Sequence, residues 1–252
     1  MTPVLAARGV TKAFGDVVAL AGLDLRVERG EFLVIVGASG CGKSTLLNLF
    51  AGFESPSAGT VLLDGREIRD VEPRCGMVFQ SYALFDWLTV SANVGFGPRM
   101  RGVDASDRVA ELLELTGIGD FGDHYPSQLS GGMRQRVALA RTLANEPDVL
   151  LCDEPFAALD AMTRQVLQQE LSRIVQHEER TCVFITHSID EALLLADRIV
   201  VLSARPGRVK NTLVNDLPRP RTADVQISDR FLDRKRAIWE SVQEEVLAGM
   251  AR

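Results

Sequence analysis

Residues 37–45 read GASGCGKST and follow directly on the apolar run FLVIV at residues 32–36. A short continuous apolar run predicts a strand buried on both faces, and residues 43–51 are expected to form the helix after the loop. The positions that define a phosphate-binding loop are filled by Gly37, Gly42, Lys43 and Ser44. Glycines let the backbone curl closely around phosphate oxygens, and the N–H groups at the helix start then face the anion. The stretch therefore predicts a nucleoside triphosphate site.

The loop residues have separate expected roles. Lys43 would reach the β- and γ-phosphates, and the Ser44 hydroxyl would ligate Mg²⁺. Cys41 lies beside Lys43 and a helix N-terminus, surroundings that lower the pKa of a thiol. We therefore expect alkylation of Cys41 to block nucleotide binding, and bound nucleotide to protect this thiol. The predicted nucleotide contacts of the loop are Gly37, Ala38, Ser39, Gly40, Cys41, Gly42, Lys43, Ser44 and Thr45.

Two carboxylates close a second apolar run, VLLCD at residues 149–153. An aspartate at a strand end can hold Mg²⁺ beside the phosphates, directly or through water, and this is the role expected of Asp153. The next residue, Glu154, can polarise an attacking water molecule. Together with the phosphate loop, the pair predicts hydrolysis of the bound triphosphate.

Strands and helices alternate along most of the chain. Leu23, Leu25 and Val27 alternate with polar residues, as in a half-buried antiparallel strand. Further apolar runs at residues 181–186 and 199–202 predict strands, with helical spacing between them and the earlier runs. This order predicts an α/β fold whose central sheet is mostly parallel, with helices on both faces. Ligands of such sheets bind beyond the carboxyl ends of the strands.

Composition excludes several classes of protein. The net charge of −6 and the pI near 5.2 disfavour a nucleic-acid binder, which usually carries a basic face. The start MTPVLAARGV has no long apolar core, and no run of apolar residues is long enough to span a bilayer. The cysteines are scattered without a CxxC pair, which argues against a zinc site or a disulfide framework. These properties lead us to expect a soluble cytoplasmic protein.

The stretch LSGGMRQR at residues 129–136 makes the interpretation specific. With the phosphate loop before it and the Asp153–Glu154 pair after it, the chain resembles the ATP-binding cassette (ABC) family, the ATPase subunits of ABC transporters. LSGG is the signature of that family, and it forms a second anion site at a helix N-terminus. The resemblance covers roughly residues 4–220. It implies an ABC-type P-loop fold with an N-terminal antiparallel β part and a helical subdomain that carries the signature.

The resemblance also implies a head-to-tail dimer. Each ATP would lie between the phosphate loop of one subunit and the signature of the other. Residues 158–160 match the D-loop, in which Asp160 crosses the dimer interface, although the usual serine of this loop is alanine at Ala157 or Ala158. The expected signature contacts to the partner's ATP are Ser130, Gly131, Gly132 and Gln135.

Other family elements fall on single residues. Phe14 matches the aromatic residue that stacks on adenine, with Val18 as its apolar neighbour. Gln80 matches the Q-loop glutamine, which reaches toward Mg²⁺ and the water and whose loop touches the membrane subunit. His187 matches the switch histidine that contacts the γ-phosphate. The resemblance thus implies ATP and Mg²⁺ as cofactors, a catalytic set of Lys43, Glu154 and His187, and metal contacts from Ser44, Gln80 and Asp153.

The predicted domain organisation is an ATPase domain at residues 1–220 and a short C-terminal helical extension at residues 221–252. The helical subdomain is expected at about residues 88–145. The expected extension is one helix with one apolar side, composed of Phe231, Ile238, Trp239, Val242 and Val246.

Several transporter classes remain possible. Residues 186–209, together with LPRPR at residues 217–221 and the position of Trp87, resemble the nitrate/sulfonate/taurine group of importers. Residues 88–103 also resemble sugar and polyamine importers, so another importer class is the alternative. A soluble cassette protein outside transport usually has two cassettes in one chain or a long coiled-coil insertion, and neither is seen in this sequence. A non-catalytic subunit would have a damaged site, but Lys43, Asp153, Glu154 and His187 are all in place. Both classes are therefore disfavoured.

The importer reading implies a set of partners. They are a second copy of the chain, two transmembrane permease subunits and, indirectly, a periplasmic or extracellular solute-binding protein, with no nucleic acid. The expected location is peripheral, on the cytoplasmic face of the inner (plasma) membrane.

Overall fold

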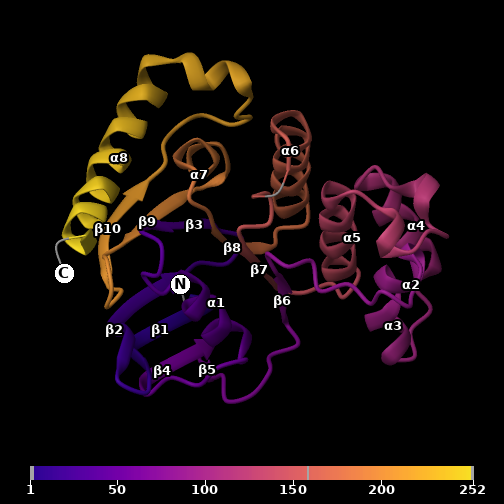
Figure 1. Cartoon of the computed structure of the whole chain (residues 1–252), viewed down its shortest axis with the longest axis horizontal. Helices are drawn as coiled ribbons and strands as arrows, with labels where there is room; N and C mark the ends of the chain where they lie inside the picture. The colour runs from indigo at the N-terminus through magenta and orange to yellow at the C-terminus, as the bar shows by residue number, and fades with distance from the viewer. Residues whose placement is uncertain (1–2, 158, 251–252) are drawn as a thin grey trace.

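A central six-stranded sheet organises the molecule (Figure 1). The computed structural model describes residues 3–157 and 159–250, so Ala158 of the predicted D-loop lies outside the described residues. The strand order is β10–β9–β3–β8–β7–β6, and only the pairing of β10 with β9 is antiparallel. The strands are β3 (Phe32–Gly37), β6 (Cys75–Val78), β7 (Val149–Asp153), β8 (Thr181–Ile185), β9 (Arg198–Leu202) and β10 (Val209–Val214). The prediction of a mostly parallel sheet is therefore confirmed.

The N-terminal part forms a second, antiparallel sheet in the order β2–β1–β4–β5. Its strands are β1 (Leu5–Phe14), β2 (Val17–Val27), β4 (Ala58–Leu63) and β5 (Arg66–Glu67). The alternation of buried Leu23, Leu25 and Val27 with exposed neighbours is confirmed in β2. This sheet and α1 (Lys43–Ala51) cover one face of the central sheet.

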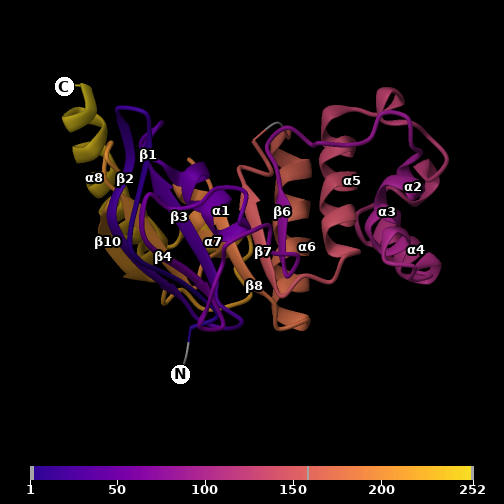
Figure 2. The same ribbon diagram turned by 90° about the horizontal axis from the view of Figure 1, so that it is seen from below.

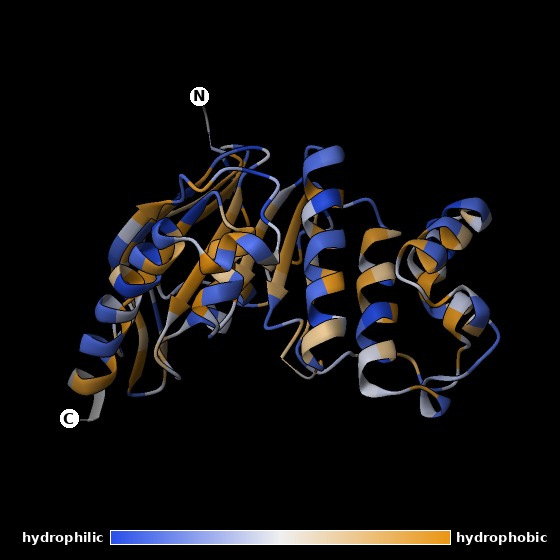
Figure 3. Cartoon of the chain, turned by 90° about the horizontal axis from the view of Figure 1, so that it is seen from above, coloured by the Kyte–Doolittle hydropathy of each residue, from blue (hydrophilic) through white to orange (hydrophobic). Residues whose placement is uncertain are grey.

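Helices cover the other face, where α6 (Ala161–His177) and α7 (Ile189–Leu195) pack. Strand β3 contributes to both cores: Phe32, Val34 and Val36 belong to the cluster under α6 and α7. Leu33 and Ile35 belong to the cluster on the α1 side. Figure 3 shows central strands that are mostly apolar and helices that are apolar along one side only. The predicted two-sided burial of this strand is confirmed.

A group of helices extends from the edge of the central sheet (Figure 2). It contains α2 (Val90–Val94), α3 (Phe96–Met100), α4 (Ser106–Leu115) and α5 (Gly131–Leu143), with the short turns η1 (Gly119–Phe121) and η2 (Pro126–Gln128). Helix α5 lies between the rest of this group and the sheet edge at β6. The group falls within the residues expected for a helical subdomain, although the domain boundaries themselves stay a prediction.

The C-terminal residues form η3 (Ala223–Ile227) and α8 (Asp229–Met250), which packs against α7 and β9. Phe231 and Ile238 are buried as expected, and Val242 packs against the same core. The placement of Trp239 on the apolar side is wrong, because its side chain is 57% exposed. One residue corresponds to about 100° around a helix, so the neighbour of a fully buried Ile238 faces outward. Among the described residues, no helix is long and apolar enough to cross a membrane.

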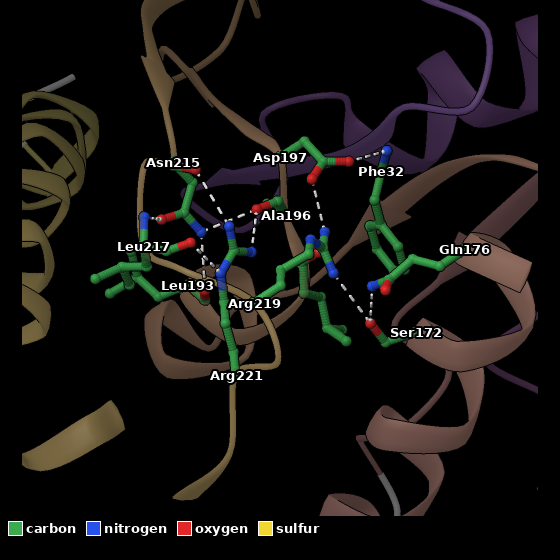
Figure 4. A network of polar contacts seen from close by, with 11 residues as sticks. Phe32, Ser172, Gln176, Leu193, Ala196, Asp197, Asn215, Leu217, Arg219 and Arg221 are labelled. Atoms are coloured by element: carbon green, nitrogen blue, oxygen red, sulfur yellow. Dashed lines mark hydrogen bonds and ion pairs between the residues drawn. The ribbon is translucent and has the colours of Figure 1, made fainter. Parts of the chain in front are cut away.

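A polar network ties the chain after β10 to the end of α7 (Figure 4). The buried Asn215 donates to the carbonyl oxygens of Leu193 and Ala196, at 2.8 and 2.9 Å. Arg221 also donates to the Ala196 oxygen, at 2.5 Å, and desolvation lowers the pKa of this guanidinium to about 10. The last carbonyls of a helix have no partners within the helix, so these side chains satisfy groups that would otherwise be unpaired.

The same network reaches the central sheet through Asp197. Its carboxylate accepts from the backbone N–H of Phe32 at 2.9 Å and from Arg219 at 2.7 Å (Figure 4). Arg219 also donates to Ser172 of α6, at 3.2 Å. The start of β3, α6 and the segment after β10 are therefore held together at one point.

We expect Asn215→Ala to lower the free energy of unfolding by about 1–3 kcal/mol, because the carbonyl of Leu193 loses its side-chain donor and that of Ala196 keeps only Arg221. The matched control is Asn211→Ala on β10, where an exposed side chain accepts from the N–H of the adjacent Thr212. Urea unfolding of both variants measures the difference. Equal stabilities would contradict this role for Asn215.

Candidate functional site

Four neighbouring parallel strands bring the predicted residues to one edge of the sheet. Strand β3 leads into the phosphate loop, β6 to Gln80, β7 to Glu154 and β8 to His187. A groove of about 580 Å³ opens at this edge. It is lined by Phe14, Val17, Ala19, Gly37, Ser39, Gly40, Gly42, Lys43, Ser44, Thr45, Gln80, Glu154, His187 and Arg205. The fold therefore gathers residues that are far apart in the sequence into one site.

The phosphate loop wraps closely around Lys43. The ammonium group of this residue donates to the carbonyl oxygens of Gly37 and Ala38, at 3.0 Å each, and the residue is only 8% exposed. Gly42 has a φ of +96°, and a Cβ there would lie 2.7 Å from a methyl carbon of Leu20. A glycine is therefore required where the loop passes β2.

Asp153, the last residue of β7, is hydrogen-bonded to Ser44, which lines the groove. Burial raises the pKa of the Asp153 carboxyl above its usual range, and a hydrogen bond with the Ser44 hydroxyl opposes this shift. With the amide of Gln80, they offer the oxygen ligands that Mg²⁺ prefers. No group of three or more His, Cys, Asp or Glu residues able to hold a metal occurs in the described part of the chain. The donor set suits Mg²⁺, which takes its other ligands from phosphates and water.

Glu154 and His187 both line the groove and are in direct contact. One carboxylate oxygen of Glu154 lies 3.2 Å from Nδ1 of His187. The backbone N–H of Glu154 donates to the carbonyl oxygen of Ile185, at 3.1 Å, although the residue has a φ of +46°. A left-handed backbone is uncommon for a residue other than glycine, and such positions concentrate at functional sites. The carboxylate is thus aimed into the groove by an unusual turn after β7.

At the other end of the groove, Phe14 supplies an aromatic surface. Its ring is 47% exposed, and the ammonium group of Lys12 lies 4.8 Å from the ring centre. The predicted neighbour Val18 is exposed, but Val17 and Ala19 line the groove instead. Alternate residues of a strand face opposite sides, which separates Val18 from these two.

The structure contradicts the expected reactivity of Cys41. This residue is 1% exposed, and burial raises the pKa of its thiol, an effect larger than the opposing influence of Lys43. The sequence places a cation and a helix start beside the thiol, but it does not show that the side chain points under the loop. The expected lowering of the thiol pKa is therefore wrong.

The signature lies outside the groove, at the start of α5. Ser130 caps this helix, since its hydroxyl accepts from the N–H of Met133 at 3.3 Å. Ser130 is exposed and Gly131 and Gly132 are half-buried, so these three can meet a partner. Gln135 differs because it is 3% exposed, and its buried amide nitrogen has no hydrogen-bond partner within the part of the chain that the structure describes. Its predicted contact with the ATP of another subunit does not fit this buried position.

The segment after Gln80 is hydrogen-bonded to α5, the helix that carries the signature. Arg141 of α5 donates to the carbonyl oxygens of Tyr82 and Ala83, at 3.3 and 2.5 Å. A Cβ on Gly131 would lie 3.0 Å from the hydroxyl oxygen of Tyr82. The segment that begins at the groove therefore contacts both the start and the end of α5.

Asp160 has a role within its own subunit. Its carboxylate accepts from the N–H of Thr163 at 3.0 Å and caps α6, and this bond lowers the pKa of the carboxyl. The preceding residue, Leu159, lies near the signature, since a Cβ on Gly132 would be 3.1 Å from a methyl carbon of Leu159. The predicted role of Asp160 at a dimer interface stays a prediction.

Arg205 is a groove residue that the sequence analysis missed. It lies in the turn between β9 and β10 and donates to the carbonyl oxygen of Gly40, at 3.3 Å. The only sequence signal is the segment RPGR at residues 205–208, which lies far along the chain from the phosphate loop.

Comparisons with known proteins show which family the chain is similar to. The family model described as ABC transporter matches residues 20–157, more than half of the chain. An uncharacterised ABC transporter ATP-binding protein of Methanocaldococcus jannaschii is 47% identical, over 98% of this chain and 94% of that protein. A taurine import ATP-binding protein of Jannaschia sp. is also 47% identical, over 81% of this chain and 80% of that protein.

A solved structure extends the likeness to the fold. It is the dimeric, post-hydrolysis state of an ATP-binding cassette bound to ADP and Pi. It shares 33% of its sequence with this chain and has a TM-score of 0.77, over 85% of this chain and all of that chain. The match in family model, sequence and fold shows that this chain belongs to the ABC transporter family and is one of its ATP-hydrolysing cassettes.

Proposed function

We propose that this chain is the ATP-hydrolysing subunit of an ABC importer, in which a head-to-tail dimer couples ATP binding and hydrolysis to uptake of a small solute. One observation carries this proposal. Lys43, Glu154 and His187 lie at one groove, whereas the exposed Ser130 end of α5 does not line it. We propose that these are two anion-binding ends, which lie at different places on the surface of the chain.

A dimer would join these two ends. Serine and glycine at a helix N-terminus present N–H groups to an anion, so the Ser130 end is suited to the phosphates of a nucleotide held by another subunit. The similar cassette solved as a dimer supports this arrangement. Ser130, Gly131, Gly132 and Asp160 are the interface residues that we propose.

The proposed mechanism is phosphoryl transfer to water. Positioning and neutralisation of charge account for most of the catalysis in such reactions. Lys43 would stabilise charge on the terminal phosphate, and His187 would contact the same phosphate while it is held by the Glu154 carboxylate. Glu154 would orient the attacking water or accept its proton. Bound Mg²⁺, held by Ser44, Gln80 and Asp153, would neutralise phosphate charge.

We propose a solute of the nitrate, sulfonate or taurine class. The taurine import ATP-binding protein, 47% identical to this chain, supports this choice. The ATPase rate of the reassembled transporter should rise with taurine-loaded binding protein and not with spermidine-loaded protein.

The proposed partners are two transmembrane permease subunits, which the chain would contact through the loop after Gln80. A solute-binding protein would act on the chain only through these subunits. The chain would then act at the cytoplasmic face of the membrane.

The domain organisation is part of the proposal. Residues 1–220 would form the ATPase domain, with the helical subdomain at about residues 88–145, and residues 221–252 would form a helical extension. Salt bridges from Asp216 to Arg230 and Arg234, at 2.7 and 2.9 Å, join α8 to the preceding segment.

We expect Glu154→Gln to slow ATP hydrolysis by about 10²- to 10⁴-fold while ATP still binds, because only the group that activates water is lost. ATP-bound dimers should then accumulate. Steady-state phosphate release measures the first effect, and light scattering after size-exclusion chromatography measures the second.

The control for this variant is Glu146→Gln. Glu146 is an exposed glutamate that also has a positive φ, of +52°, but it lies before β7 rather than after it. It should hydrolyse ATP at the wild-type rate. A Glu154→Gln protein with wild-type turnover would overturn the assigned role.

We expect Cys41 to resist alkylation in the folded protein. Only the thiolate reacts, and burial raises the pKa of this thiol and shields it from reagent. Iodoacetamide labelling at pH 7.5, followed by peptide mass spectrometry, should show Cys41 modified in urea but largely unmodified without it, with or without ATP. Rapid labelling of the native protein that ATP suppresses would contradict this expectation.

A further inference from the structure

A buried polar cluster lies next to the turn that carries His187. Its members are Thr186, which directly follows β8, Glu191 of α7 and Gln168 of α6. All three side chains are buried, whereas His187 is exposed and lines the groove. A buried carboxylate needs hydrogen-bond partners, so the contacts of Glu191 show what this cluster holds in place.

Glu191 accepts a hydrogen bond at each of its carboxylate oxygens. The Thr186 hydroxyl donates to Oε2, and the side-chain amide of Gln168 donates to Oε1 at 2.7 Å. Burial raises the pKa of the Glu191 carboxyl, and the hydrogen bonds from Thr186 and Gln168 oppose this shift. The carboxylate thus joins α6 to the residue directly before His187.

Ser188 completes the attachment on the other side of His187. Its backbone N–H donates to the Thr186 hydroxyl oxygen at 3.0 Å, and its own hydroxyl accepts from the N–H of Glu191 at 3.3 Å. A hydroxyl has one proton, so the Thr186 oxygen that accepts from Ser188 still has its proton for the Glu191 carboxylate. Both neighbours of His187 are therefore hydrogen-bonded to Glu191.

We propose that Glu191 is a positioning residue for ATP hydrolysis, which fixes the turn after β8 so that His187 is held against Glu154 at the groove. This inference rests on the proposed role of His187 in hydrolysis. The His187 ring lies 3.2 Å from the Glu154 carboxylate, and its side chain is otherwise largely exposed. An exposed side chain has little packing to orient it, so its direction depends on the backbone of the turn.

The test is steady-state ATP hydrolysis by Glu191→Leu, expressed per folded molecule as measured by near-UV circular dichroism. The kcat should fall about 10²-fold, because a shift of about 1 Å in a group at the reaction site can cost that much. The KM for ATP should stay near the wild-type value, since Lys43 and the phosphate loop are unchanged. Glu191→Gln should keep most of the turnover, because its amide oxygen can accept from Thr186 and its nitrogen can donate to a reoriented Gln168 amide.

The matched control is Asp190→Leu, which removes the neighbouring carboxylate of the same helix. Asp190 pairs with Lys235 of α8, at 2.7 Å, and its variant should hydrolyse ATP at the wild-type rate. Thr186→Val is a second, nearly isosteric variant that removes only the hydroxyl of the cluster. It should lose turnover as Glu191→Leu does, whereas Thr186→Ser should keep it.

The double variant His187→Ala/Glu191→Leu separates positioning from a general structural role. If Glu191 acts through His187, the double variant should be no slower than His187→Ala alone. A loss equal to the product of the two single losses would overturn the inference, and so would wild-type turnover of Glu191→Leu. Wild-type turnover of His187→Ala would instead overturn the proposed role of His187 in the mechanism.

Discussion

Two-sided burial of β3 is the constraint on which the functional site depends. Alternate side chains of this strand pack into two different hydrophobic cores. A one-residue shift in the register of β3 would therefore move each side chain to the opposite face of the sheet. Asp197 holds the first N–H of the strand, and the phosphate loop begins at its last residue. The position of Lys43 relative to the carboxylates at the end of β7 is therefore set by the hydrophobic packing of the sheet.

Local signals made much of this fold predictable from the sequence. Continuous apolar runs gave β3 and β7, and the helix at residues 43–51 has the bounds that were expected. Lys43, Ser44 and Glu154 stand in short motifs that can be interpreted from the residues alone, whereas Gln80 and His187 were expected from the family resemblance. All five line the groove. Because the carboxyl ends of parallel strands lie at the same edge of the sheet, residues that follow these strands lie close together.

The errors concern side chains whose surroundings come from distant parts of the chain. The sequence shows the neighbours of Cys41, Gln135 and Trp239 along the chain, but their burial depends on how a loop or helix is rotated against its support. Arg205 was missed for the same reason, since no local pattern connects a turn after β9 with Gly40. Side-chain orientation and long-range contacts thus mark the limit of what motifs can predict.

The attachment of the segment after Gln80 to α5 has a mechanical consequence. Arg141 and Tyr82 join that segment to the helix whose first residues carry the signature. Because these contacts are made near both ends of α5, a displacement of the segment would shift the helix as a whole. In the proposed dimer, such a shift would also move Ser130 at the start of α5, which is the proposed contact with the nucleotide of the partner.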